Sequence, residues 1–186
     1  NFLSQLPDNV KKIGVDIDES AIERGRQKNK KSDIEFFLGD FETFLYNGSE
    51  PDTITMYHVL EHLPRPIEVL KKLRSISKIS TKIVVEVPII ENGNTNDING
   101  FFSIQHTTHF SANSLFNCFA LAGWKIEKGY KVSDYNGYRV VASPQSNIDS
   151  DIVLKRENKD WANLNSSLLS WYEAINDVEK NIQNIP

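Results

Sequence analysis

The chain of 186 residues has a single cysteine and no long apolar run. One cysteine, Cys118, excludes an internal disulfide framework and is typical of a reducing compartment. The longest apolar runs, such as Ile83–Val85, are far shorter than the ~20 residues that cross a bilayer. No signal peptide opens the sequence. We therefore expect a cytoplasmic protein that does not bind a membrane.

An excess of positive charge is also missing. The 21 Lys and Arg residues are outnumbered by 25 Asp and Glu residues, which gives a formal net charge of −4. A protein that grips a phosphate backbone needs a basic surface, so we expect no nucleic-acid partner. Hydrophobic residues make up 39% of the chain, which is enough for a packed core and too much for a disordered chain.

The third absence is a phosphate-binding loop. Neither a Gly-x-Gly-x-x-Gly sequence nor a P-loop occurs. Either the ligand lacks a pyrophosphate, or the glycine loop lies before Asn1. Because the chain begins at Asn1 rather than at a methionine, and its first residues resemble the end of a helix, we expect a fragment of a longer protein.

Short apolar runs alternate with helical patterns in the first half of the chain. Strands are predicted at Lys12–Ile17, Ile34–Leu38, Thr53–Tyr57 and Ile83–Val87. A helix of about ten residues follows the first strand, with Asp18 or Ser20 as its N-cap, and another follows Pro64 and Pro66. This alternation indicates a parallel sheet with helices on both faces.

The pattern changes after Pro88. Residues 91–100 are polar and irregular, and a helix is predicted over Ala112–Ala122, capped by Ser111. The runs Trp124–Tyr130 and Tyr138–Ser143 are close enough in sequence to pair as antiparallel strands. We predict an α/β fold with a doubly wound, mostly parallel sheet and an antiparallel closing hairpin over residues 1–146.

The predicted remainder, residues 147–186, is a linker and an amphipathic C-terminal helix. Eight apolar residues are spaced by alternating threes and fours between Trp161 and Ile185. Such a narrow seam is typical of a helix that packs on a partner, a second copy or its own domain. Self-association or a neighbouring domain through Trp161–Ile185 is therefore one of the alternatives.

Acidic residues follow two successive strands. Asp16 ends the first strand and Asp40 follows the second, and ligands of parallel α/β sheets bind at the carboxyl ends of strands. Asp16 is either a ribose ligand or a turn residue, and Asp40 either faces an adenine amino group or caps the segment 41–45. Together the two acids suggest a ligand that contains adenosine.

An ordered set of motifs resembles the class I S-adenosylmethionine-dependent methyltransferases. It comprises GVDI, FLGD, HVLEHL followed by proline and a helix, His-x-x-x-Phe-Ser, and Ala-Gly-Trp, and it covers roughly residues 10–143. The resemblance implies S-adenosylmethionine as cofactor, and it places the family's first strand and glycine-rich loop before Asn1. It also implies that Asp16 holds the ribose hydroxyls, that Asp40 faces the adenine edge and that Met56–Val59 flank the methyl donor. The cofactor-binding residues that it implies are Asp16, Ile17, Asp40, Phe41, Tyr57 and His58.

Histidines are the candidate general bases, because imidazole titrates near the working pH. A subset of the family that methylates carbon atoms of nucleotide-linked deoxysugars carries Glu-His where this chain has Gln105-His106. The resemblance therefore implies His106 as the first candidate base, with His58 and His109 behind it. His58 is alternatively a buried, hydrogen-bonded side chain.

The acceptor pocket is expected to be bounded by residues 89–111, with a small molecule, and within that class a sugar or sugar nucleotide, as substrate. Tyr138 and Arg139 loosely match a motif of the same subset, so both are expected at the substrate. Arg139 either binds a phosphate or carboxylate of the acceptor or forms a surface ion pair with Asp134.

The sequence predicts no metal site. His58 and His62, and His106 and His109, are close in sequence, but no cysteine pair or facing carboxylate set accompanies them. Glu61 and His62 are expected to orient the start of the next helix. The functional alternative to an enzyme is a non-catalytic, methyltransferase-like module that assembles through its C-terminal helix.

Overall fold

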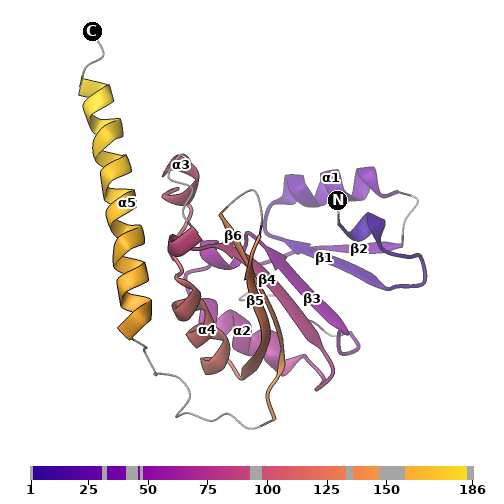
Figure 1. Cartoon of the computed structure of the whole chain (residues 1–186). Helices are drawn as coiled ribbons and strands as arrows, with labels where there is room; N and C mark the ends of the chain where they lie inside the picture. Colours follow the sequence, from indigo (N-terminus) through magenta and orange to yellow (C-terminus); the bar gives the residue numbers. More distant parts are fainter. Residues whose placement is uncertain are drawn as a thin grey trace. The chain divides into compact units, whose positions relative to one another are not determined.

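The computed structural model describes residues 2–30, 33–40, 46, 48–92, 98–132, 136–146 and 158–183 (Figure 1). Internal contacts group the chain into two units, Asn1–Gly48 and Ser49–Pro186, which are described separately. The expected division between a core at 1–146 and a tail at 147–186 stays a prediction. Among the described helices, none has the length and apolar character that a membrane span requires.

The first unit is a two-stranded parallel sheet with one helix. Strands β1 (Lys12–Asp16) and β2 (Ile34–Leu38) pair in register from Lys12 opposite Ile34 to Asp16 opposite Leu38. The connecting helix α1 (Glu19–Lys28) begins after Asp18, whose side chain accepts a hydrogen bond from the Ser20 backbone N–H at 2.8 Å. Of the two predicted N-caps, Asp18 is therefore the one that the structure uses.

Close packing fixes α1 against β2. A Cβ atom at Gly25 would lie 2.9 Å from the Phe36 ring, so glycine lets the helix approach the strand. A short 3-10 helix, η1 (Leu3–Gln5), precedes β1.

The second unit contains a four-stranded sheet in the order β3-β4-β6-β5. Its strands are β3 (Thr53–Tyr57), β4 (Lys82–Pro88), β5 (Trp124–Lys131) and β6 (Gly137–Pro144). The pair β3–β4 is parallel, whereas β6 is antiparallel to both β4 and β5. The predicted parallel sheet with an antiparallel closing hairpin is thus confirmed.

Helices α2 (Pro66–Ser75) and α4 (Ala112–Leu121) pack together over this sheet. Helix α4 begins at the predicted cap, Ser111, which forms a capping box with Ser114. The buried Trp124 ring at the start of β5 donates a hydrogen bond from Nε1 to the Leu70 carbonyl of α2 at 2.9 Å. These contacts bury the core of the unit, which includes Leu70, Leu115 and Phe119.

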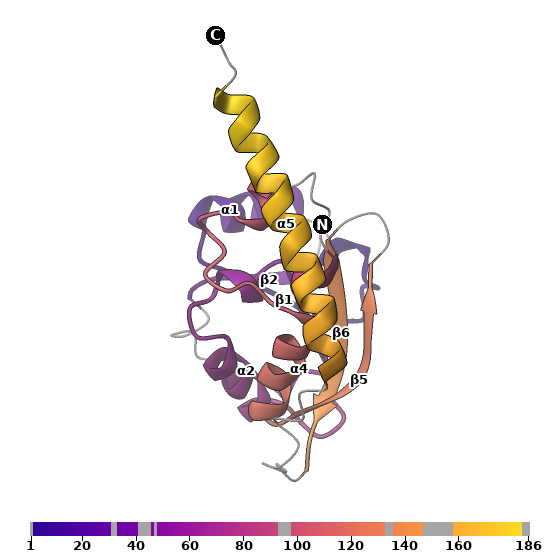
Figure 2. The same cartoon turned by 60° about the vertical axis from the view of Figure 1, so that its left-hand side comes forward.

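The C-terminal helix α5 (Asn158–Gln183) is drawn in yellow in Figures 1 and 2. It packs on its own unit through Trp171. Trp171 is 2% exposed, stacks on Phe101 of α3 (Ile98–Phe101) at 4.7 Å between ring centroids, and donates from Nε1 to the Ile90 carbonyl of η3 (Ile90–Asn92) at 3.2 Å. Other apolar side chains of α5, such as Tyr172 and Ile182, are exposed. The ends of the predicted seam, Trp161 and Ile185, have no described side chain.

Candidate active site at the carboxyl ends of the strands

His58 is the first residue after β3, and two buried glutamates hold its ring. Nδ1 lies 3.3 Å from Glu61 Oε1, and Nε2 lies 3.4 Å from Glu86 Oε1. The close contact with Glu61 and the negative charges of both glutamates raise the pKa of His58, and partial burial opposes this effect. The imidazole is still 43% exposed, so a ligand in solvent can reach it.

The backbone of His58 is strained. Its φ angle is 51°, the left-handed region that non-glycine residues rarely adopt, and its N–H donates to the Glu86 carbonyl at 2.9 Å. Such strain is typical of functional sites, where neighbouring structure over-determines one conformation. Here it turns the chain at the strand end so that the imidazole reaches both glutamates.

Glu86 is paired with Arg139 across the β4–β6 register. Its carboxylate is 1% exposed, and Arg139 donates to Oε2 from Nε at 2.7 Å and from Nη2 at 2.5 Å. The guanidinium also lies 5.3 Å from the Tyr57 ring centroid and 5.9 Å from that of Tyr130. These four residues occupy facing positions on four neighbouring strands, so they form one row across the sheet.

The two residues expected at the substrate point to opposite faces of the sheet. Tyr138 and Arg139 are consecutive in β6, and side chains alternate along a strand. Arg139 joins the row beside His58. On the other face, the centroid of the Tyr138 ring lies 6.0 Å from that of the Phe116 ring of α4. The alternative ion pair with Asp134 involves a residue outside the described ones, and the guanidinium pairs with Glu86.

Glu61 lies in η2 (Leu60–His62), the short turn that follows β3. Its side chain is fully buried, and within the described part of the chain neither carboxylate oxygen has a hydrogen-bond partner. Helix α2 begins after Arg65 without a side-chain cap, and the expectation that Glu61 orients its start stays a prediction. The Glu61 carbonyl accepts hydrogen bonds from Thr107 and Thr108, which ties η2 to the segment before α4.

Three further histidines gather around this turn, each with one ring nitrogen at a backbone carbonyl. His62 Nδ1 is 2.9 Å from the Gln105 oxygen, and His106 Nδ1 is 2.8 Å from the Phe101 oxygen. His109 Nε2 is 3.1 Å from the same Phe101 oxygen. The His62 and His106 rings meet edge to face, with centroids 4.8 Å apart.

The predicted cofactor residues of the first unit lie at the ends of β1 and β2. Asp16 is exposed, and its Oδ1 accepts a hydrogen bond from the Asp18 N–H at 2.9 Å, as in an Asx-turn. The Gly39 N–H donates to the Asp16 carbonyl at 2.9 Å, which brings the two strand ends together. Ile17 and Asp40 are exposed there too. Phe41, and the segment that Asp40 would cap, lie outside the described residues.

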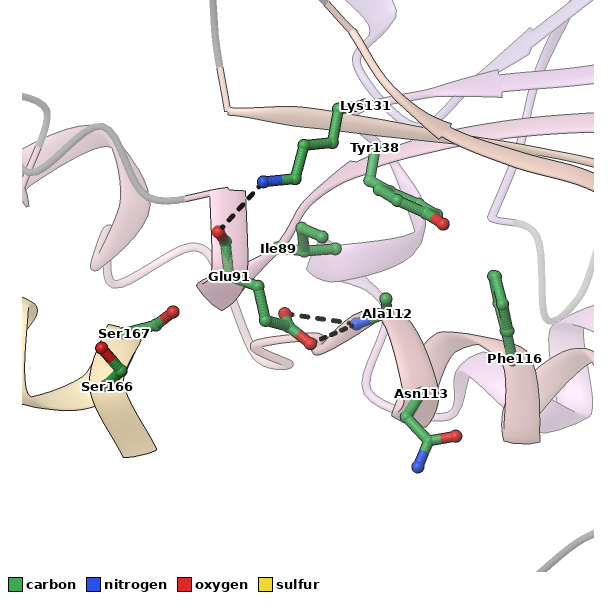
Figure 3. Close-up of a pocket in the computed structure, with 9 residues that line it drawn as sticks. All are labelled: Ile89, Glu91, Ala112, Asn113, Phe116, Lys131, Tyr138, Ser166 and Ser167. Carbon is green, nitrogen blue, oxygen red and sulfur yellow. Dashed lines mark hydrogen bonds between the residues drawn. The ribbon is translucent and has the colours of Figure 1, made fainter. Parts of the chain in front are cut away.

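A pocket of about 490 Å³ lies on the Tyr138 side of the sheet (Figure 3). It is lined by Ile89, Glu91, Ala112, Asn113, Phe116, Lys131, Tyr138, Ser166 and Ser167. The Glu91 carboxylate accepts from the Ala112 N–H at 3.0 Å and 3.3 Å, which places a negative charge at the start of α4. Burial raises the pKa of Tyr138, and the Glu91 charge adds to the effect.

Sequence reasoning singled out the histidines and Arg139 but missed the acids that hold them. Glu86 interrupts the most β-branched run of the chain, IVVEV, and a carboxylate in such a run was the available signal. A charged residue inside a buried strand needs a partner. Arg139 supplies positive charge to Glu86, and His58 does so when it is protonated.

Comparisons with known proteins agree with this architecture. A family model described as a methyltransferase domain matches residues 2–128. No curated protein sequence matches the chain. Similar solved structures include a chain of the complex between the Trm112 methyltransferase activator and a methyltransferase of Haloferax volcanii, at 15% identity and a TM-score of 0.62, covering 74% of this chain and 72% of that one.

Two more solved structures share the fold. The PH0226 protein of Pyrococcus horikoshii is 20% identical with a TM-score of 0.58, covering 74% of this chain and 73% of that one. The magnesium protoporphyrin IX methyltransferase of Synechocystis, crystallised with bound SAH, is 16% identical with a TM-score of 0.55, covering 72% and 64%. The chain therefore belongs to the methyltransferase-domain family and is an S-adenosylmethionine-dependent methyltransferase with a Rossmann-like fold.

Proposed function

We propose that this methyltransferase transfers the methyl group of S-adenosylmethionine to a small-molecule acceptor, with sugars and sugar nucleotides as the first class to test. The observation that carries the proposal is His58, an exposed imidazole held between two buried carboxylates at the end of β3. In parallel α/β sheets, the carboxyl ends of strands are where ligands bind. An imidazole held there is suited to act on a bound substrate.

His58 is proposed as the general base, ahead of His106 and His109. The two glutamates stabilise its protonated form, which raises the pKa of this imidazole above its ordinary value of 6.5. The neutral ring takes the proton from the acceptor hydroxyl or carbon acid. The acceptor electron pair then forms the new bond to the methyl carbon while the bond from that carbon to sulfur breaks, which leaves S-adenosylhomocysteine and an imidazolium that the glutamates stabilise.

Arg139 and its aromatic neighbours are proposed to hold the acceptor. Nε and Nη2 are occupied by Glu86, but a guanidinium carries five N–H donors, so others are available to a phosphate or carboxylate. Tyr57 and Tyr130 flank it, with 36% and 43% of their surfaces exposed. A guanidinium between two aromatic rings suits a ligand that carries an anionic group, such as a phosphorylated sugar. This arrangement supports the sugar-nucleotide class.

Asp16 is proposed to bind the ribose of the cofactor. Its Oδ1 accepts from the Asp18 N–H, and no other hydrogen bond or ion pair reaches the Asp16 carboxylate within the described residues, so Oδ2 can accept from a ribose hydroxyl. Ile17, 69% exposed, and Asp40 are proposed to contact the adenosine as well. The positions of Asp16 and Asp40 at strand ends support their roles, and the role of Ile17 follows from the family resemblance.

The experiment is a calorimetric titration with S-adenosylhomocysteine, followed by a methyl-transfer assay on a panel of sugars, sugar nucleotides and other small acceptors. Asp16→Ala should weaken binding by about 30-fold, equivalent to about 2 kcal/mol for charge-assisted hydrogen bonds. Asp33→Ala, at the opposite end of β2, is the matched control and should bind normally.

The outcomes separate the proposal from its alternative. His58→Gln should retain S-adenosylhomocysteine binding and lose methyl transfer, because only the base is removed. Cofactor binding without transfer to any acceptor of the panel would instead favour the non-catalytic module. Equal affinity of the Asp16→Ala and Asp33→Ala variants would refute the ribose role of Asp16.

A further inference from the structure

The Glu61 carboxylate is the least satisfied polar group that the structure describes in the second unit. It is fully buried, and neither oxygen accepts a hydrogen bond within the described residues. His58 lies 3.3 Å from Oε1 but is shared with Glu86. A buried carboxylate needs a paired positive charge. The His58 ring is shared with Glu86, so it balances the negative charge of Glu61 only in part.

Two imidazoles lie beside the same carboxylate, and a backbone carbonyl fixes the tautomer of each. Backbone carbonyls can only accept hydrogen bonds, so the contacts of His62 Nδ1 with Gln105 and of His106 Nδ1 with Phe101 place a hydrogen on each Nδ1. In the neutral rings the lone pair is then on Nε2. A carbonyl that fixes the tautomer and orientation of a ring in this way is the usual outer partner of a metal-binding histidine.

Glu61, His62 and His106 already converge. Glu61 Oε1 is 4.0 Å from His62 Nε2, and one ligand atom from each of the three residues lies within 4.8 Å of the other two. In a tetrahedral zinc centre, ligand atoms lie about 3.4 Å apart. The set therefore has to contract by at most about 1.4 Å. Because His62 and His106 are only partly buried, small side-chain rotations can supply this contraction.

We propose that Glu61, His62 and His106 bind a divalent first-row transition ion, with zinc as the ion that this ligand set favours. One carboxylate and two imidazoles are the protein ligands of one known type of catalytic zinc centre, which keeps a fourth position for water or a substrate oxygen. The ion supplies the charge that the buried carboxylate lacks. This site goes beyond the methyl-transfer proposal and differs from the sequence prediction of no metal, and its test does not depend on an acceptor.

The alternative is that His58 alone balances Glu61. That arrangement needs no ion, and it predicts that the cluster does not bind one. The two cases differ in a direct binding measurement.

The experiment uses the full chain without an affinity tag, stripped with a chelator and titrated with Co²⁺, a spectroscopic substitute for Zn²⁺. We expect one equivalent to bind with visible d–d absorption, and Zn²⁺ to displace it. His62→Gln and His106→Gln should each weaken Co²⁺ binding by at least about 10-fold. Loss of a residue that only supports a metal ligand already costs about 10-fold, so loss of a ligand should cost no less. His109→Gln is the matched control, because His109 contacts the same Phe101 carbonyl but is not part of the cluster, and it should bind Co²⁺ normally.

Thermal unfolding gives a second measurement. Zn²⁺ should raise the melting temperature of the natural chain and of His109→Gln, but not that of Glu61→Gln, which keeps the shape of the side chain and removes its charge. Absence of d–d bands, or affinity that is the same in all the histidine variants, would overturn the proposal. Circular dichroism of each variant confirms folding, and His62→Gln and His106→Gln test the site independently should either fail to fold.

Discussion

The ion pair between Glu86 and Arg139 provides the sharpest test of how this site is held together. Arg139→Gln removes the cation that donates to Glu86 Oε2 from two nitrogens, and among the described ion pairs of this 1% exposed carboxylate it leaves the contact with His58, 3.4 Å away. Breaking a buried pair costs roughly 3–5 kcal/mol, because an uncompensated charge remains buried. Arg139 is 30% exposed and His58 remains, so we expect a loss of about 2–3 kcal/mol in the free energy of unfolding.

The double variant Glu86→Gln/Arg139→Gln should recover at least about half of this loss, because no charge is then left unpaired. Lys82→Gln is the matched control in the same strand: its pair with Glu127 is exposed on both sides, so its loss should stay below about 1 kcal/mol. Urea unfolding followed by circular dichroism measures all four proteins.

A single-variant loss below about 1 kcal/mol, or a double variant as unstable as the single one, would refute the view that Glu86 depends on Arg139 for its burial.

Three further predictions follow from other contacts. His58→Gln should lower the free energy of unfolding below about pH 6.5, and the difference should fade as the pH rises through the raised pKa of His58, because only the imidazolium pairs with the glutamates. Urea unfolding at several pH values measures this difference, and a difference that does not change with pH would contradict the reasoning. Trp171→Ala should release α5 at a local cost of about 3–5 kcal/mol, seen as faster amide exchange in α5 but not in β4, whereas Tyr172→Ala should not. Ser111→Ala should cost about 1 kcal/mol in urea unfolding through loss of the α4 cap, and a cost near zero would show that Glu91 satisfies that helix end alone.

Local patterns were reliable wherever burial and capping act within one element. The run IVVEV forms a central strand because its β-branched side chains pack on both faces, and Ser111 starts α4 because its hydroxyl reaches the Ser114 N–H. The seam of the C-terminal helix was equally clear in the sequence, but its partner was not. Only the docking of Trp171 on Phe101 shows that the helix packs on its own unit.

The candidate site divides in the same way. The sequence by itself determined the family motifs, the acids at the ends of β1 and β2, and the histidines as the groups that titrate near neutral pH, because these depend on residue type and short spacing. Tertiary structure decided which of them meet: strand register sets Arg139 against Glu86, the left-handed turn at His58 directs its ring to two acids, and η2 buries Glu61 beside His62 and His106. Pairing across strands and burial of charge depend on contacts between residues distant in sequence, and no local pattern encodes those distances.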